Sequence, residues 1–186
     1  MLIRKPYTIS LLLAGIVFSF GCSAAPSPAE LSAPDDEALV LNLTDYWKLA
    51  NKRQAGNEHV LQYLPTGADP RNPSEMITVT TVSGIHPDKD AKTYMIQVRN
   101  AMESAKELAS FSWQMVKSTA EDSSCEYTFT GHSKIPDQLE IMRVIRGAGE
   151  IHSIIYHFGK ANVPKAEKDR AWAIVNAVKL APASTQ

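Results

Sequence analysis

One stretch of the chain, between Ala91 and Leu108, constrains the fold more than any other. Its apolar residues recur at helical spacings: Ala91, Tyr94, Met95, Val98, Met102, Ala105 and Leu108. This spacing places them on one face of a helix, and Pro87, Asp88 and Asp90 suit the first turn of such a helix. The sequence therefore predicts an amphipathic helix from about Pro87 to Leu108 that packs one face on a core.

The segments before this helix have the alternation and composition of strands. Three stretches are expected to be extended: Tyr46 to Arg53, Glu58 to Leu64 and Met76 to Val82. Residues 54–57 suit a turn between the first two, and the third is dense in β-branched side chains. The first stretch could instead be a short helix capped by Thr44.

A run of strands is expected after the helix. The segments are Phe111 to Thr119, Cys125 to Gly131, Leu139 to Arg146 and Glu150 to Phe158. Gly147 and Gly149 predict a hairpin between the last two. Those two strands carry apolar residues on both faces, which predicts a sheet that is covered on both sides. The opposing sets are Ile141 and Ile145 against Met142 and Val144, and Ile154 against Ile155.

The end of the chain completes the predicted fold class. Pro164 opens a second helix, which ends before Pro182 and has a stripe of Ala171, Ile174, Val175 and Val178. Strands followed by a helix, more strands and a helix predict an α+β domain. We expect an antiparallel sheet of about six strands flanked by two main helices, an α/β/α sandwich. The single domain should span residues 38–182, with a short tail at 183–186.

The first 21 residues have the pattern of a secretion signal. Arg4 and Lys5 precede an apolar run from Leu11 to Phe20, and Gly21-Cys22 ends it. The cleavage site resembles the bacterial lipobox, although Ser19 and Phe20 depart from its usual residues. The resemblance implies cleavage before Cys22 and a lipid (palmitate) anchor on that cysteine. A plain signal peptidase site near Ser23, an uncleaved anchor and a buried core segment are alternatives.

Residues 22–37 are rich in Pro, Ala, Ser and acidic residues and contain no aromatic residue. This composition predicts a flexible tether between the lipid and the domain. By resemblance to enterobacterial sorting rules, Ser23 after the cysteine favours the periplasmic face of the outer membrane. Secretion into the periplasm is the alternative location.

Charge and cysteine content limit the function classes. The chain has a net charge of −1, and removing Arg4 and Lys5 with the leader makes it more acidic. Global charge therefore gives no reason to expect a nucleic-acid partner. If Cys22 carries lipid, Cys125 has no partner for a disulfide, and it shares a strand face with Tyr127 and Phe129. We expect Cys125 to be a buried structural thiol.

No pattern in the chain predicts catalytic, cofactor-binding or metal-binding residues. Cys125 and His132 are seven residues apart on one expected strand, so they lie on opposite faces. The same parity separates His152 from His157, and neither these two nor His59 and His86 have a metal-binding spacing. A site formed by Cys125 or by histidines that converge only in the fold is the alternative hypothesis.

Two glycines and three basic residues also have ordinary structural explanations. Gly147 and Gly149 lack the third glycine and following helix of a dinucleotide loop. Arg143 and Arg146 with Lys134 could form a small basic patch, but solvated charges at strand edges are the expected interpretation.

One loop, between Pro65 and Ser74, is long enough to present a surface of its own. It contains three prolines, which restrict its conformations. If the domain binds a partner, we expect the contacts to come from this loop. The candidate residues are Pro65, Thr66, Asp69, Arg71 and Asn72.

The segment from Tyr63 to Gly67, followed by Met76 to Val79, resembles the Mog1/PsbP-like sandwich seen in several small bacterial lipoproteins. The resemblance covers roughly residues 45–180 as an order of elements and includes no catalytic motif. It implies a binding or assembly accessory. The sequence therefore predicts a non-enzymatic, lipid-anchored envelope protein with an unidentified protein partner; the alternative is a periplasmic enzyme or metal-handling protein.

Overall fold

The fold is that of a computed structural model, which describes residues 37–86, 89–104, 110–131 and 136–182. The leader, Cys22 and nearly all of the expected tether lie outside these residues. The elements are β1 (Glu37–Val40), β2 (Trp47–Ala55), β3 (Glu58–Pro65), β4 (Glu75–Ser83), α1 (Ala91–Ser104), β5 (Ser110–Ser118), β6 (Asp122–Thr130), β7 (Gln138–Arg146), β8 (Glu150–Phe158), α2 (Lys165–Ala177) and β9 (Lys179–Pro182).

A seven-stranded antiparallel sheet forms the centre of the molecule, in the order β2-β3-β4-β8-β7-β6-β5. The α+β prediction is confirmed. The expected strand number, about six, is too low, because the segment that could have been a helix pairs with β3 from Trp47 to Ala55. β1 and β9 form a separate two-stranded sheet that the sequence did not indicate. Four residues in each strand are too few to show an alternating pattern.

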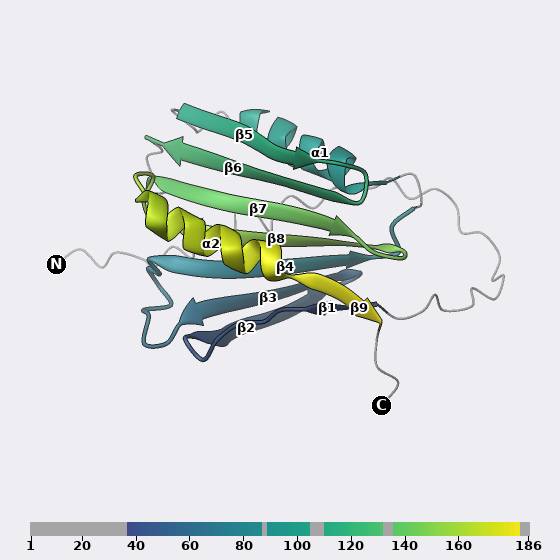
Figure 1. The fold of residues 1–186 in the computed structure, drawn as a ribbon, viewed down its shortest axis with the longest axis horizontal. Helices are drawn as coiled ribbons and strands as arrows, with labels where there is room; N and C mark the ends of the chain where they lie inside the picture. Colours follow the sequence, from purple (N-terminus) through teal and green to yellow (C-terminus); the bar gives the residue numbers. More distant parts are fainter. Residues whose placement is uncertain (1–36, 87–88, 105–109, 132–135, 183–186) are drawn as a thin grey trace.

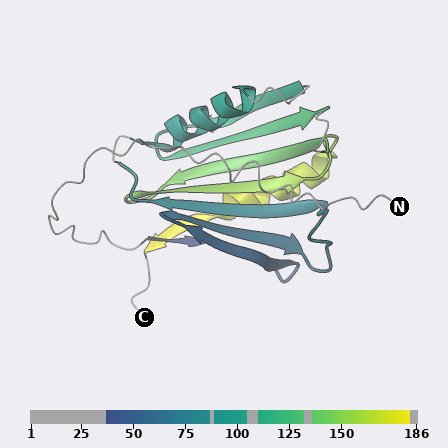
Figure 2. The ribbon, with the colours of Figure 1, turned by 180° about the vertical axis from the view of Figure 1, so that it is seen from behind.

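The two helices cover opposite faces of the sheet. Figure 1 shows α2 in front of the central strands, with β9 continuing from it, and Figure 2 shows α1 on the other side, near β5 and β6. Ile141 and Ile154 point to the α2 face, whereas Met142 and Ile155 point to the α1 face. The prediction of a sheet that is apolar on both faces is therefore confirmed.

Helix α1 begins at a side-chain cap. The Asp90 carboxylate accepts a 2.6 Å hydrogen bond from the Thr93 backbone N–H, which lowers the pKa of Asp90. The buried positions are Ala91, Met95, Val98 and Met102, four members of the expected stripe. Ala105 and Leu108 lie outside the described residues. Neither described helix has the length and apolar character needed to cross a membrane.

Helix α2 begins after Pro164, whose carbonyl accepts hydrogen bonds from the Glu167 and Lys168 N–H groups. Ala171 and Val175 are fully buried against the sheet. The helix ends at Ala177 because Val178 is extended, with φ −65° and ψ 134°, and leads directly into β9. Pairing with β1 then holds β9 against the α2 face of the domain.

Both edges of the sheet carry an irregularity in register. It falls between Leu49 and Asn51 on β2, and between Met115 and Lys117 on β5. Such bulges are common at edge strands and hinder pairing with another chain. The edges therefore do not offer a regular strand for a partner to extend.

Candidate functional site

The loop between β3 and β4 lies at the same end of the sheet as the start of α2 (Figure 1). Thr66, Asp69, Arg71 and Asn72 are exposed there. Pro65 differs, because it is the last residue of β3 and is buried. The structure thus places four of the five predicted contact residues on an accessible surface.

Hydrogen bonds fix the first half of this loop to the segment that enters β2. The Thr66 N–H donates to the Tyr46 carbonyl at 2.7 Å, and its hydroxyl reaches the Asp45 and Tyr46 carbonyls at 3.1 and 3.0 Å. The Asp69 carboxylate accepts from the Arg71 N–H at 2.9 Å, and the Asp69 carbonyl accepts from the Asn72 N–H at 3.2 Å. These are the bonds of an Asx-type turn, and they set the loop conformation.

The second half of the loop is held by the chain that follows β8. The Gly159 N–H donates to the Ser74 carbonyl at 2.9 Å. A Cβ at position 159 would lie 3.0 Å from the Pro73 carbonyl oxygen, so only glycine allows this approach without movement. The loop is therefore exposed but anchored at both ends, a combination that favours binding because little motion has to be frozen.

A charged and aromatic cluster lies directly beside this loop. Glu75, the first residue of β4, forms an ion pair with Arg170 of α2 and accepts a 3.4 Å hydrogen bond from the Tyr46 hydroxyl. Trp47 packs edge-on against Tyr156, with ring centroids 5.5 Å apart. We name Tyr46, Glu75, Tyr156 and Arg170 the loop-end cluster. No local spacing in the sequence indicates it, since Glu75 and Arg170 are 95 residues apart.

Cys125 is fully buried beneath α1, among the apolar residues that include Tyr127 and Phe129. Its Sγ lies 3.4 Å from Met95 Sδ. Burial, and then the nearby Glu140 carboxylate, raise the pKa of the thiol, so the nucleophilic thiolate is disfavoured. The structural interpretation of Cys125 is confirmed for its placement.

His152 and His157 lie on opposite faces of the sheet, as strand parity indicated. His152 contacts Thr81 through Nδ1 at 2.9 Å on the α2 face, whereas His157 contacts Glu140 at 3.1 Å on the α1 face. His132 lies outside the described residues. Within the described parts of the chain, no group of three His, Cys, Asp or Glu residues is placed to hold a metal ion.

A buried polar cluster on the α1 face was missed by sequence reasoning. Glu140, 2% exposed, accepts hydrogen bonds from Tyr127 and Gln138 and contacts His157 Nδ1. Burial raises the pKa of Tyr127 well above its usual value, and the Glu140 charge adds to this effect. The Gln138 Oε1 atom is buried and has no hydrogen-bond partner among the residues that the structure describes. We name these four residues the Glu140 cluster.

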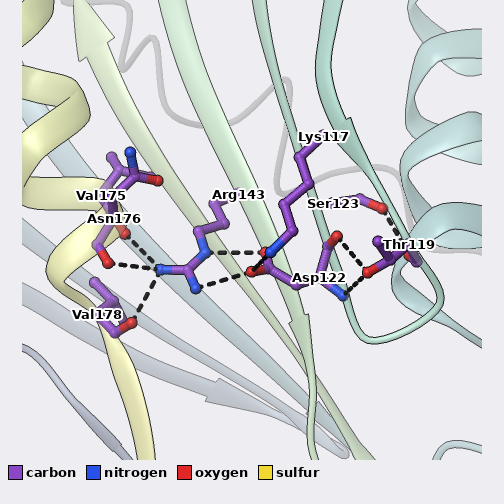
Figure 3. A network of polar contacts seen from close by, with 8 residues as sticks. All are labelled: Lys117, Thr119, Asp122, Ser123, Arg143, Val175, Asn176 and Val178. Atoms are coloured by element: carbon purple, nitrogen blue, oxygen red, sulfur yellow. Dashed lines mark hydrogen bonds and ion pairs between the residues drawn. The ribbon is translucent and has the colours of Figure 1, made fainter.

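A second network, drawn in Figure 3, links the end of α2 to the sheet. Arg143 donates two 3.0 Å hydrogen bonds to Asp122, and its Nη1 lies 2.9 to 3.1 Å from the carbonyl oxygens of Val175, Asn176 and Val178. Lys117 also donates to Asp122, at 2.6 Å. The Arg143 side chain is only 15% exposed.

The expectation of a solvated edge charge is therefore wrong for Arg143, which lies on the interior strand β7 and caps a helix. Lys134, the third member of the suggested basic patch, lies outside the described residues. Burial alone would raise the pKa of Asp122, but the hydrogen bonds from Arg143 and Lys117 outweigh it and the pKa is lowered.

No protein-family model and no curated protein sequence matches the chain. Among solved structures, LpqN of Mycobacterium tuberculosis, described as involved in cell envelope biogenesis, is similar with a TM-score of 0.47 and 15% identity over 84% of this chain and 90% of LpqN. A mutant of the protein Mog1 is similar with a TM-score of 0.45 and 12% identity, over 73% of this chain and 78% of the Mog1 chain. The Ran-binding protein Mog1p of Saccharomyces cerevisiae is similar with a TM-score of 0.43 and 11% identity, over 75% of this chain and 84% of Mog1p.

At identities of 15% or less and TM-scores below 0.5, the similarity concerns the arrangement of helices and strands alone. Function has to be argued from the residues of this chain.

Proposed function

We propose that this protein is a non-enzymatic binding module of the cell envelope, tethered to the membrane by lipid on Cys22. The observation that carries the binding role is the Pro65–Ser74 loop, which is exposed along most of its length and fixed at both ends. A prefixed loop loses little conformational entropy when a partner binds. The partner we expect is a protein of the envelope.

The envelope location comes from the leader. A charged start, a short apolar run and Gly21-Cys22 favour export and lipidation, and Ser23 favours the periplasmic face of the outer membrane. Several acyl chains would hold the domain stably, whereas one chain binds a membrane only marginally. LpqN is involved in cell envelope biogenesis, which is compatible with this proposal but adds no weight at such low similarity.

The anchor is tested by metabolic labelling with palmitate in the cells that make the protein. The wild-type chain should incorporate label and fractionate with membranes, and Cys22→Ala should abolish both. Export of an unlabelled, soluble wild-type chain would instead support the plain signal peptidase site near Ser23.

The binding role is tested by replacing residues 66–72 with a Gly/Ser segment of equal length, leaving Pro65, Ser74 and Gly159 intact. Affinity capture from detergent-solubilised membranes should recover a stoichiometric envelope protein with the wild type and lose it with the variant. Recovery that is unaffected by the replacement would refute the role of the loop.

The competing enzymatic hypothesis depends on Cys125 or on convergent histidines. Because burial raises the pKa of the Cys125 thiol, we expect alkylation of the folded protein to be at least ~100-fold slower than that of the denatured chain. Rapid alkylation under native conditions, or metal found by elemental analysis of the purified protein, would favour the enzymatic hypothesis.

A further inference from the structure

The loop-end cluster has the composition of a binding hot spot, since Tyr, Trp and Arg dominate the energetics of protein interfaces. Tyr46 is 48% exposed, and the Arg170 side chain is 52% exposed. Both adjoin the loop: Tyr46 accepts the Thr66 N–H, and Glu75, the partner of Arg170, follows the loop directly. The surface of the loop therefore continues onto an exposed aromatic ring and an exposed guanidinium.

Glu75 lies on the buried side of Arg170 and holds it in place. Its side chain is only 11% exposed, and its two oxygens contact Arg170 and Tyr46 separately. The ion pair with Glu75 uses Nη2 of Arg170, whereas a guanidinium has five N–H donors in a planar fork. The Arg170 guanidinium is thus oriented by the Glu75 carboxylate, and its remaining N–H groups can donate to a second carboxylate.

Tyr156 forms the inner side of this cluster. The residue is fully buried, and Glu75 and Arg170 are the charged neighbours of its hydroxyl. Burial raises the pKa of this hydroxyl, and the Glu75 carboxylate adds to the effect, so the group stays neutral. Glu75 and Tyr156 therefore contact the inner side of the Arg170 guanidinium and hold it in place.

We infer that the loop-end cluster receives a carboxylate of the partner protein, an acidic side chain or a chain terminus, against Arg170, with apolar partner atoms on Tyr46. This inference rests on the proposed binding function and names the chemistry of its partner. A carboxylate matches the planar fork of Arg170 with two parallel hydrogen bonds, a geometry that lysine cannot reproduce.

The test is photo-crosslinking in the cells that make the protein, with a photoreactive phenylalanine analogue at position 46. A matched control carries the analogue at Val116, which is 58% exposed and lies on β5, the opposite edge strand. Position 46 should give a discrete adduct with one envelope protein, and position 116 should not. Arg170→Ala should lower the adduct yield at position 46 by about thirtyfold at limiting expression, as expected for a hot-spot residue.

Two further variants distinguish the loss of the guanidinium geometry from a general loss of folding. Arg170→Lys keeps the charge but lacks the fork, so its yield should also fall, by roughly tenfold. Lys165→Ala on the same helix removes an exposed ion pair with Asp169 and should leave the yield unchanged. Thermal unfolding of each variant identifies any loss that is due to misfolding.

Several outcomes would overturn the inference: an adduct yield that Arg170→Ala and Arg170→Lys leave intact, an adduct containing only a second copy of this chain, or crosslinks to lipid alone. If replacing the loop abolishes capture while position 46 gives no adduct, the proposed function stands and this inference fails. If neither experiment detects a partner, both fail.

Discussion

Two arginines at α2 use the same chemistry, an ion pair with a carboxylate, in opposite ways. At the far end Arg143, 15% exposed, is saturated by Asp122 and by three carbonyls at the end of the helix. Beside the Pro65–Ser74 loop, Arg170 of α2, 52% exposed, is held by Glu75 and open to solvent. Burial separates a stabilising contact from one that remains available to a partner.

The largest loss of stability is expected at Glu140, which is fully buried. Glu140→Ala should lower the free energy of unfolding by about 3–5 kcal/mol, because Tyr127, Gln138 and His157 would lose their shared acceptor inside the core. Urea denaturation measures this. Glu140→Gln, which keeps the size and one oxygen, should cost less; equal stability of Glu140→Ala and wild type would contradict the role of the Glu140 cluster.

Arg143→Ala should cost roughly 2–4 kcal/mol, since it uncaps the end of α2 and leaves Asp122 partly buried with Lys117 alone. The same denaturation experiment applies, with Lys165→Ala as the exposed control, for which we expect less than about 0.5 kcal/mol. If the two variants were equally stable, burial would not be what distinguishes Arg143.

Acid titration tests the Asp122 pair separately. The pKa of Asp122 is lowered in the folded state, so the pair contributes stability above the ordinary value of 3.8 and loses it as the pH falls through the lower folded value. The stability difference between wild type and Asp122→Asn should be largest at neutral pH and shrink below pH 3.8. If the stability difference between wild type and Asp122→Asn did not change with pH, the charge of Asp122 would not contribute to stability.

Arg170→Ala should lower the free energy of unfolding by less than Arg143→Ala does, about 1 kcal/mol, because the Arg170 side chain is 52% exposed although that of Glu75 is only 11% exposed. Its effect should appear in partner binding instead. A loss of stability as large as that of Arg143→Ala would mean that Arg170 is structural, and the contrast between the two arginines would fail.

Strand parity made much of the fold predictable. Alternation along β6 placed Cys125 with Tyr127 and Phe129, and along β8 it separated His152 from His157, because successive side chains point to opposite faces. Parity depends only on local spacing. It therefore held along β6 and β8, which pair without a register shift in their contacts with β7.

Contacts between distant segments were not predictable in the same way. Glu140 finds its partners 13 and 17 residues away, on β6 and β8, and Arg143 reaches carbonyls more than 30 residues away. In the sequence both are single charged residues in an apolar strand, where no spacing indicates a partner. The loop at 65–74 could be identified because its three prolines lie close together in the sequence. Arg170 could not be connected with it, because it is 95 residues away from its partner Glu75.

The most direct test of the central claim compares Arg143→Ala with Arg170→Ala by crosslinking from position 46, at a temperature where both variants are folded. We predict that Arg143→Ala, although less stable, keeps the wild-type adduct yield, and that Arg170→Ala loses about thirtyfold. Equal yields in the two variants, whether both retained or both lost, would contradict the account.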